Sequence, residues 1–138
     1  MSTLVNDRDR QLFTDITPAE ASIIEGGRKI FLSHIQALRL TKDEKDGRDE
    51  PYILANGRNI WAAKGGMKVG DTRRIGKFVS SPLRWFANIQ LWENDGFGRL
   101  SDDFIGQLPV TPWMPKGKKV ATLTGSGAKY KLFYRVLG

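Results

Sequence analysis

The residues best suited to chemistry in this chain are its carboxylates, because most of them are gathered into two short segments. Beyond residue 27 the sequence holds ten acidic residues, and nine of them fall within residues 43–50 or 93–103. The first segment has Asp43, Glu44, Asp46, Asp49 and Glu50, the second has Glu93, Asp95, Asp102 and Asp103, and the tenth is Asp71. Crowded carboxylates repel one another, and a hard cation with oxygen ligands relieves that repulsion. The alternative is that both segments are solvated turns, screened by Lys42, Lys45, Arg48 and Arg99.

Other kinds of reactive site find little support in the sequence. There are no cysteines, which excludes disulfides and thiolate metal sites. The one histidine, His34, lies in an apolar stretch typical of a strand, where a structural role is the more common one. No nucleophile-elbow pattern and no phosphate-loop glycine pattern occurs. We therefore expect a protein that is not an enzyme.

The spacing of the acidic residues resembles the calcium loops of the calcium/lipid-binding β-sandwich domain found in protein kinase C and synaptotagmins. In residues 43–52, two aspartates six positions apart are followed closely by Pro51 and Tyr52. In residues 91–106, two acidic residues separated by a spacer follow an apolar run, and a further aspartate precedes an apolar pair and a glycine. The resemblance implies a calcium site with these ligands: Asp43, Asp49, Glu93, Asp95 and Asp103. The sequence departs from the family pattern in having Glu50 inserted before Pro51, Glu93 in place of an aspartate, and a longer second loop.

A second motif lies in residues 12–27. Its apolar residues fall at steps of three, five and three, which approximates one stripe of an amphipathic helix, and two glycines follow. The pattern resembles the double-glycine leader of exported bacterial peptides and small proteins, which an ABC transporter with its own peptidase cuts and exports. The resemblance implies recognition of Phe13, Ile16, Ala21 and Ile24 and cleavage after Gly26 and Gly27. The alternative is an ordinary N-terminal helix closed by a glycine cap.

The charge distribution agrees with a division of the chain at residue 27. Residues 1–27 carry two basic and five acidic side chains, which gives a net charge of −3. Residues 28–138 carry 20 basic and 10 acidic side chains, a net charge of +10, and the two segments together give the +7 of the whole chain. We therefore expect a leader or processing segment, residues 1–27, and one domain, residues 28–138. No apolar run reaches the length of about 18 residues that a membrane-spanning helix needs.

The domain reads as short strands separated by turn residues. The candidates are residues 30–40, 52–55, 59–63, 72–79, 84–92, 104–110, 120–124 and 130–136. Asn56-Gly57 is a strong signal for a hairpin, and Gly125-Ser126-Gly127 suggests another between the last two strands. Apolar and polar residues alternate in several of these runs. The sequence thus predicts an all-β fold, a single antiparallel β-sandwich of about eight strands, preceded by a short helical or disordered leader.

Four tryptophans are expected at core or edge positions of this sandwich, namely Trp61, Trp85, Trp92 and Trp113. Trp113 lies in a proline-rich stretch, and stacking on a base or a sugar is a second interpretation for it alone.

The leading functional expectation is an exported bacterial calcium-binding β-sandwich that acts as a non-catalytic adhesion or membrane-contacting module. Its basic surface favours anionic lipid or acidic polysaccharide as a partner, and nucleic acid less so. We expect a secreted, extracellular location after removal of the leader; the oligomeric state is left open. Two alternatives belong to other classes: a secreted, bacteriocin-like antagonistic effector, and a structural assembly or matrix subunit whose acidic loops are passive turns.

Overall fold

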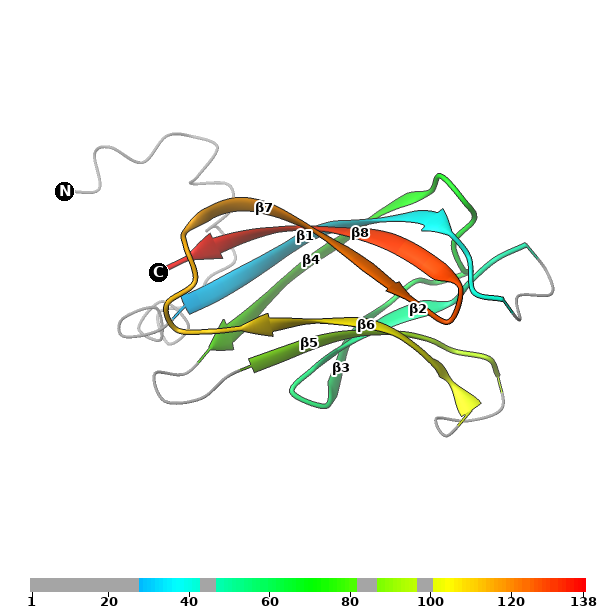
Figure 1. Ribbon diagram of the computed structural model, residues 1–138, viewed down its shortest axis with the longest axis horizontal. Helices are drawn as coiled ribbons and strands as arrows, with labels where there is room; N and C mark the ends of the chain where they lie inside the picture. The colour runs from blue at the N-terminus through cyan, green and yellow to red at the C-terminus, as the bar shows by residue number, and fades with distance from the viewer. Residues whose placement is uncertain (1–27, 43–46, 82–86, 97–100) are drawn as a thin grey trace.

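A computed structural model describes residues 28–42, 47–81, 87–96 and 101–138, which form a sandwich of two antiparallel sheets. The strands are β1 (Arg28–Arg39), β2 (Pro51–Ala55), β3 (Arg58–Ala62), β4 (Thr72–Ser81), β5 (Ala87–Glu93), β6 (Asp103–Val110), β7 (Gly117–Gly125) and β8 (Ala128–Leu137). Sheet A has the order β4-β1-β8-β7, and sheet C has the order β3-β2-β5-β6 (Figure 1). The predicted eight-stranded all-β sandwich is therefore confirmed. The leader residues, Asp43 and Trp85 lie outside the described residues.

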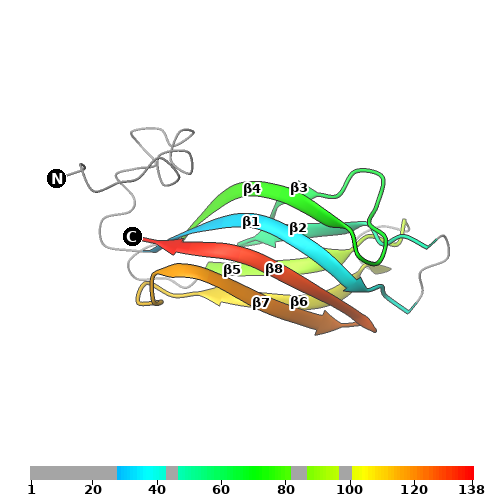
Figure 2. The ribbon, with the colours of Figure 1, turned by 90° about the horizontal axis from the view of Figure 1, so that it is seen from above.

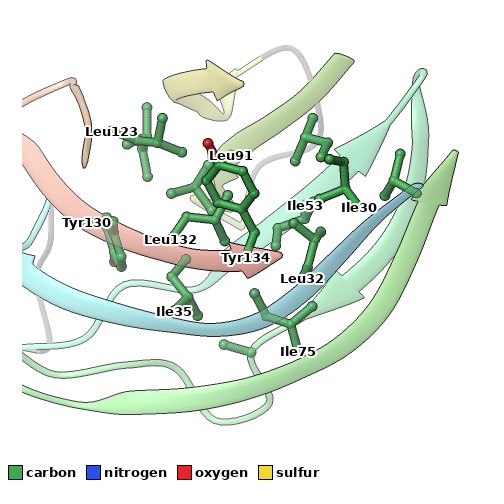
Figure 3. Close-up of a cluster of buried hydrophobic side chains, with 14 of the residues drawn as sticks. Ile30, Leu32, Ile35, Ile53, Ile75, Leu91, Leu123, Tyr130, Leu132 and Tyr134 are labelled. Carbon is green, nitrogen blue, oxygen red and sulfur yellow. The ribbon is translucent and has the colours of Figure 1, made fainter. Parts of the chain in front are cut away.

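The core lies between the two sheets and follows the alternation read from the sequence. In β8, Ala128, Tyr130, Leu132, Tyr134 and Val136 are all buried, while the residues between them are only partly covered. Ala87, Ile89 and Leu91 of β5 belong to the same core in the other sheet and are equally buried. Figure 3 shows Leu91 in this cluster with Leu132 and Tyr134. Burial of each large aliphatic side chain contributes about 1.5–3 kcal/mol to the free energy of unfolding. This apolar layer holds the sheets together.

Strand β1 departs from a simple alternation. Ile30 and Leu32, at even positions, are buried, and so are Ile35 and Ala37, at odd positions. In a regular strand, even and odd positions would face opposite sides of the sheet. The pairing of β1 with both neighbours shifts between Leu32 and His34, which marks a β-bulge. The extra residue at the bulge changes which positions of β1 face the core, so that apolar side chains before and after the bulge both reach it. His34 itself is exposed.

Both predicted hairpins are present. Asn56 and Gly57 have φ values of 52° and 82°, the positive values that a type I′ turn requires, and they join β2 to β3. Ser126 and Gly127, with φ values of 54° and 84°, join β7 to β8. Strand β7 begins at Gly117 rather than Val120, because β8 supplies backbone partners as far as Val136.

Three connections meet at one end of the sandwich. The backbone of Asp49, before β2, pairs with Met67 in the connection between β3 and β4, and the amide of Asn94, after β5, donates to the carbonyl oxygen of Glu50. The hairpin at Ser126 joins them, since its carbonyl accepts the amide of Lys42. Figures 1 and 2 show this end opposite the C-terminus. Among the described residues, no helix is long and apolar enough to cross a membrane.

Candidate functional site

Acidic residues from both segments come together at this end of the sandwich, which we call the carboxylate end. Its six described carboxylates are Asp49, Glu50, Glu93, Asp95, Asp102 and Asp103. Asp49 and Glu50 directly precede β2, Glu93 ends β5, and Asp103 begins β6. Glu93 and Asp103 are paired directly across β5 and β6. Residues far apart in sequence are brought together because β2 and β6 are both neighbours of β5.

Asp49 is held tightly inside the fold. Its side chain has no exposed surface, and its carboxylate accepts hydrogen bonds from the Thr41 amide, the Thr41 hydroxyl (2.8 Å) and the Tyr130 hydroxyl (2.7 Å). The backbone there is equally constrained, because Gly66 lies so close that a Cβ on it would meet the Asp49 carbonyl oxygen at 2.9 Å. A carboxylate with three hydrogen-bond donors stabilises the fold by connecting β8 to the segment that follows β1.

The Tyr130 hydroxyl remains a proton donor at any ordinary pH. Burial, the hydrogen bond to Asp49 and the charge on that carboxylate all raise the pKa of the phenol above its usual range. The phenol therefore stays protonated and donates its hydrogen bond to Asp49 within the core.

Glu93 is the most perturbed carboxyl of the site. Its side chain is 7% exposed, and one carboxyl oxygen accepts the amide of Glu50 at 3.3 Å. Burial first, and then the charges of Asp49, Asp103 and Asp95, raise the pKa of Glu93 to about 7, against the lowering effect of the Glu50 amide. The side chain therefore titrates near neutrality, and its proton is in competition with any cation that enters the cluster.

Two further carboxylates, Asp95 and Asp102, accept hydrogen bonds between the end of β5 and the start of β6. Asp102 accepts a hydrogen bond from the Tyr52 hydroxyl at 2.5 Å and one from the amide of Asp95 at 3.3 Å. Asp95 in turn accepts the hydroxyl of Ser101 at 3.0 Å.

A pocket of about 450 Å³ opens beside this cluster. Its polar lining comes from Glu50, Asn94, Asp102, Asn59 and the Tyr52 ring, and its remaining walls are Pro51, Ala62 and Ala63. The lining that the described residues provide is rich in oxygen acceptors and includes no basic side chain, which suits a cation. The sequence-based ligand set omitted Glu50, Asn94 and Asp102. The signal for Glu50 was present, since it stands directly before Pro51.

The structure bears on the predicted calcium ligands in different ways. Asp49, Glu93, Asp95 and Asp103 lie close enough for three of them to perturb the pKa of the fourth. Among the described residues, however, no group of three or more His, Cys, Asp or Glu side chains is positioned to hold a metal ion. Asp49 turns into the core toward Thr41 and Tyr130, and Asp43 lies outside the described residues. The donor chemistry fits calcium, and the ligand set stays a prediction.

Comparisons with known proteins bear on the fold. No protein-family profile matches the sequence, and no curated protein does either. Among solved structures, the tandem C2 domains of extended synaptotagmin 2 match with a TM-score of 0.52 and 18% identity, over 81% of this chain and 40% of that chain. A calcium-bound structure of the same domains matches with a TM-score of 0.52 and 16% identity, over 81% of this chain and 45% of that one. The chain thus spans less than half of those proteins. At this identity the likeness shows the fold, a sandwich of the C2 type.

Proposed function

We propose that this chain is a non-catalytic module that binds calcium at the carboxylate end and thereby attaches to an anionic surface. The observation that carries the proposal is Glu93, whose carboxyl has a pKa raised to about 7 by burial and by three neighbouring carboxylates. Negative charge concentrated in this way favours a bound cation, and the donors available are all oxygens. The C2-type fold, with similar domains known in a calcium-bound form, adds support.

The residues that would hold calcium are Glu93, Asp95 and Asp103, with Asp43 from the preceding segment. Asp49, which is buried and bonded to Thr41 and Tyr130, would contribute its negative charge to the site. Calcium takes roughly six to eight oxygens, so backbone carbonyls and water would complete the shell. When bound, the ion neutralises the carboxylates and makes this end of the molecule attractive to phosphate or carboxylate groups on a surface.

Calcium is therefore expected to stabilise the folded state. By mass action, a hundredfold excess of calcium over its dissociation constant adds about 2.7 kcal/mol to the free energy of unfolding. Thermal unfolding of chelator-stripped protein, followed during a calcium titration, measures this gain. The variants Asp95→Asn and Asp103→Asn should lose the gain, and magnesium should give less of it, because it prefers a smaller octahedral shell.

The matched control is Asp71→Asn, which removes one carboxylate elsewhere. Asp71 accepts the amide of Lys68, a bond that an asparagine oxygen can also accept, and it is not among the groups that raise the pKa of Glu93. This control should keep the full calcium effect. A melting temperature that does not change from micromolar to millimolar calcium would contradict the proposal and favour a structural subunit with passive acidic turns.

We also propose that residues 1–27 are a double-glycine leader and that the domain acts outside a bacterial cell. The support is the sequence pattern that ends at Gly27. Mass spectrometry of the protein recovered outside the producing cells should find Arg28 as the N-terminus. An extracellular protein that still begins at Met1 or Ser2 would refute the leader.

A further inference from the structure

The two sheets differ sharply in charge. The four strands of sheet A contain eleven Lys and Arg residues and no Asp or Glu, as the strand bounds and the sequence show. The four strands of sheet C contain one basic residue, Arg58, and two acidic ones, Glu93 and Asp103. The positive charge of the domain is thus concentrated in one layer of the sandwich.

Strand alternation places much of this charge on the outer face of sheet A. In β8 the core-facing residues alternate with Lys129, Lys131, Phe133 and Arg135, which face outward. Their partners across the sheet are also outward: Thr122 of β7 pairs with Lys131, and Lys118 pairs with Arg135. A sheet whose outer positions repeat lysine and arginine presents an extended surface of positive charge rather than a single point.

A groove of about 310 Å³ lies on this face. Phe31 of β1 and Phe133 of β8 line it together with the basic residues Lys118, Lys119 and Arg135. Val120 of the edge strand β7 also lines the groove and is 55% exposed. Trp113, shortly before β7, is 69% exposed. The exposed Val120 therefore lies beside the cations of the groove, and the exposed Trp113 lies in the connection that leads into the same edge strand.

We propose that the outer face of sheet A docks on a lipid bilayer that carries anionic phosphate headgroups, without any need for calcium. The cations offer charge complementarity to such a surface, and the groove has cations beside an apolar lining, which suits a phosphate next to an acyl chain. Exposed tryptophan is typical of the membrane interface, where an amphipathic ring lies at the level of the headgroups. Trp113 and Val120 are the side chains that would enter this layer.

The geometry favours a bilayer over a single-stranded nucleic acid. Binding of unpaired bases relies on open aromatic rings on which the bases stack. Phe31 is only 8% exposed, and it packs on Phe78 with ring centroids 4.9 Å apart. Phe133 is only partly exposed. The exposed apolar groups of this edge are a valine and a loop tryptophan, which suit insertion between lipids better than a row of stacked bases.

Vesicle co-sedimentation in the presence of a calcium chelator tests this proposal. The full chain should bind vesicles of phosphatidylglycerol in phosphatidylcholine and should not bind vesicles of phosphatidylcholine alone. Each basic side chain near an anionic membrane contributes roughly a fivefold gain in affinity. The double variant Lys118→Gln, Lys131→Gln should therefore bind the anionic vesicles about 25-fold more weakly.

The matched control is the double variant Lys64→Gln, Lys68→Gln, which has the same net charge but changes exposed residues in the connection between β3 and β4, outside sheet A. It should bind nearly as the original chain does, and melting temperatures should show that both variants are folded. Equal weakening by the two double variants would mean that net charge alone drives binding, and it would overturn the assignment of this face.

Further measurements separate this proposal from the calcium proposal. Calcium-induced thermal stabilisation and vesicle binding in chelator are measured separately, so that failure of the calcium proposal and failure of this one are distinguishable results. Binding that appears only when calcium is added would overturn the docking role of sheet A. Tight binding of a single-stranded oligonucleotide, with no binding of anionic vesicles, would overturn it in favour of nucleic acid.

Discussion

At the scale of single residues, the informative contrast is between two buried carboxylates of the same cluster. Asp49 has three hydrogen-bond donors around it, one of them the Tyr130 hydroxyl. Glu93 accepts the amide of Glu50 and faces three other carboxylates. Donors stabilise the charged form of a carboxyl group, whereas burial and like charges destabilise it. The free-energy cost of bringing these carboxylates together therefore comes mainly from ionised Glu93.

This cost should appear as a pH dependence of stability. The folded pKa of Glu93, about 7, lies above its ordinary value of 4.5, so the folded state binds more protons than the unfolded chain between these values. The contribution of Glu93 to the free energy of unfolding is therefore greatest below about pH 4.5 and is lost as the pH rises to about 7. The loss amounts to at most about 3 kcal/mol, since one pKa unit corresponds to about 1.4 kcal/mol.

Glu93→Gln is expected to remove this loss, because the amide oxygen can still accept the Glu50 amide while the charge is gone. Urea unfolding in chelator, at about pH 5 and about pH 8, gives the measurement, and the variant should gain about 1–3 kcal/mol on the original chain at the higher pH. Identical pH dependence in both chains would show that Glu93 is not the group that titrates.

The sequence could predict which residues are acidic and grouped, but not which of them face the core. Asp49 and Tyr130 are 81 positions apart, so no local pattern relates them. Their contact exists only because β8 lies next to β1 in sheet A, which brings Tyr130 up to the segment that follows β1. Asp102 was overlooked for a similar reason, because its partner is the hydroxyl of Tyr52, 50 positions away.

At the scale of strands and turns, local chemistry predicted the structure well. Alternating apolar residues located all eight strands, and Asn56-Gly57 located a hairpin, because such signals act over two to eight residues. Strand ends were less predictable: β7 starts earlier than its apolar residues suggest, since its backbone pairs with β8 through Lys118 and Lys119. The bulge in β1 was not foreseen, because it depends on both neighbouring strands.

Gly125, the last residue of β7, marks a point where the two sheets come very close. A Cβ at this position would lie 2.3 Å from the carbonyl oxygen of Ile105 in β6, a backbone atom that cannot rotate away. Gly125→Ala should therefore force β6 and β7 apart and lower the free energy of unfolding by about 1–3 kcal/mol, as overpacking does. Urea unfolding measures the loss.

The comparison variant is Gly57→Ala, which has a positive φ of 82° but no atom within 4 Å of the added methyl group. It should lose only about 1 kcal/mol, the cost of placing alanine in a left-handed conformation. If Gly125→Ala is no worse than Gly57→Ala, the sheets are not in rigid contact at this point.

At the scale of the whole molecule, the described residues form a hydrophobic core between the two sheets. Its members come from β1 to β8 and from connections between them. We therefore expect a chain of residues 28–138 to fold, although its net charge rises from +7 to +10. Thermal unfolding should place its melting temperature within about 10 °C of the full chain, a change equivalent to roughly 2 kcal/mol for a domain of this size. A larger drop would show that residues 1–27 pack as structure.

The pairing of the first strand with the last has a consequence for how the protein is made. Lys29 of β1 pairs with Leu137 of β8, and β4 is the other partner of β1. During translation, at roughly 5–20 residues per second, about a hundred residues must follow β1 before β8 leaves the ribosome. That delay is of the order of ten seconds, whereas β-sandwiches with such long-range pairing typically fold in milliseconds to seconds. The nascent chain therefore has a first strand without its β8 partner for longer than the finished chain needs to fold.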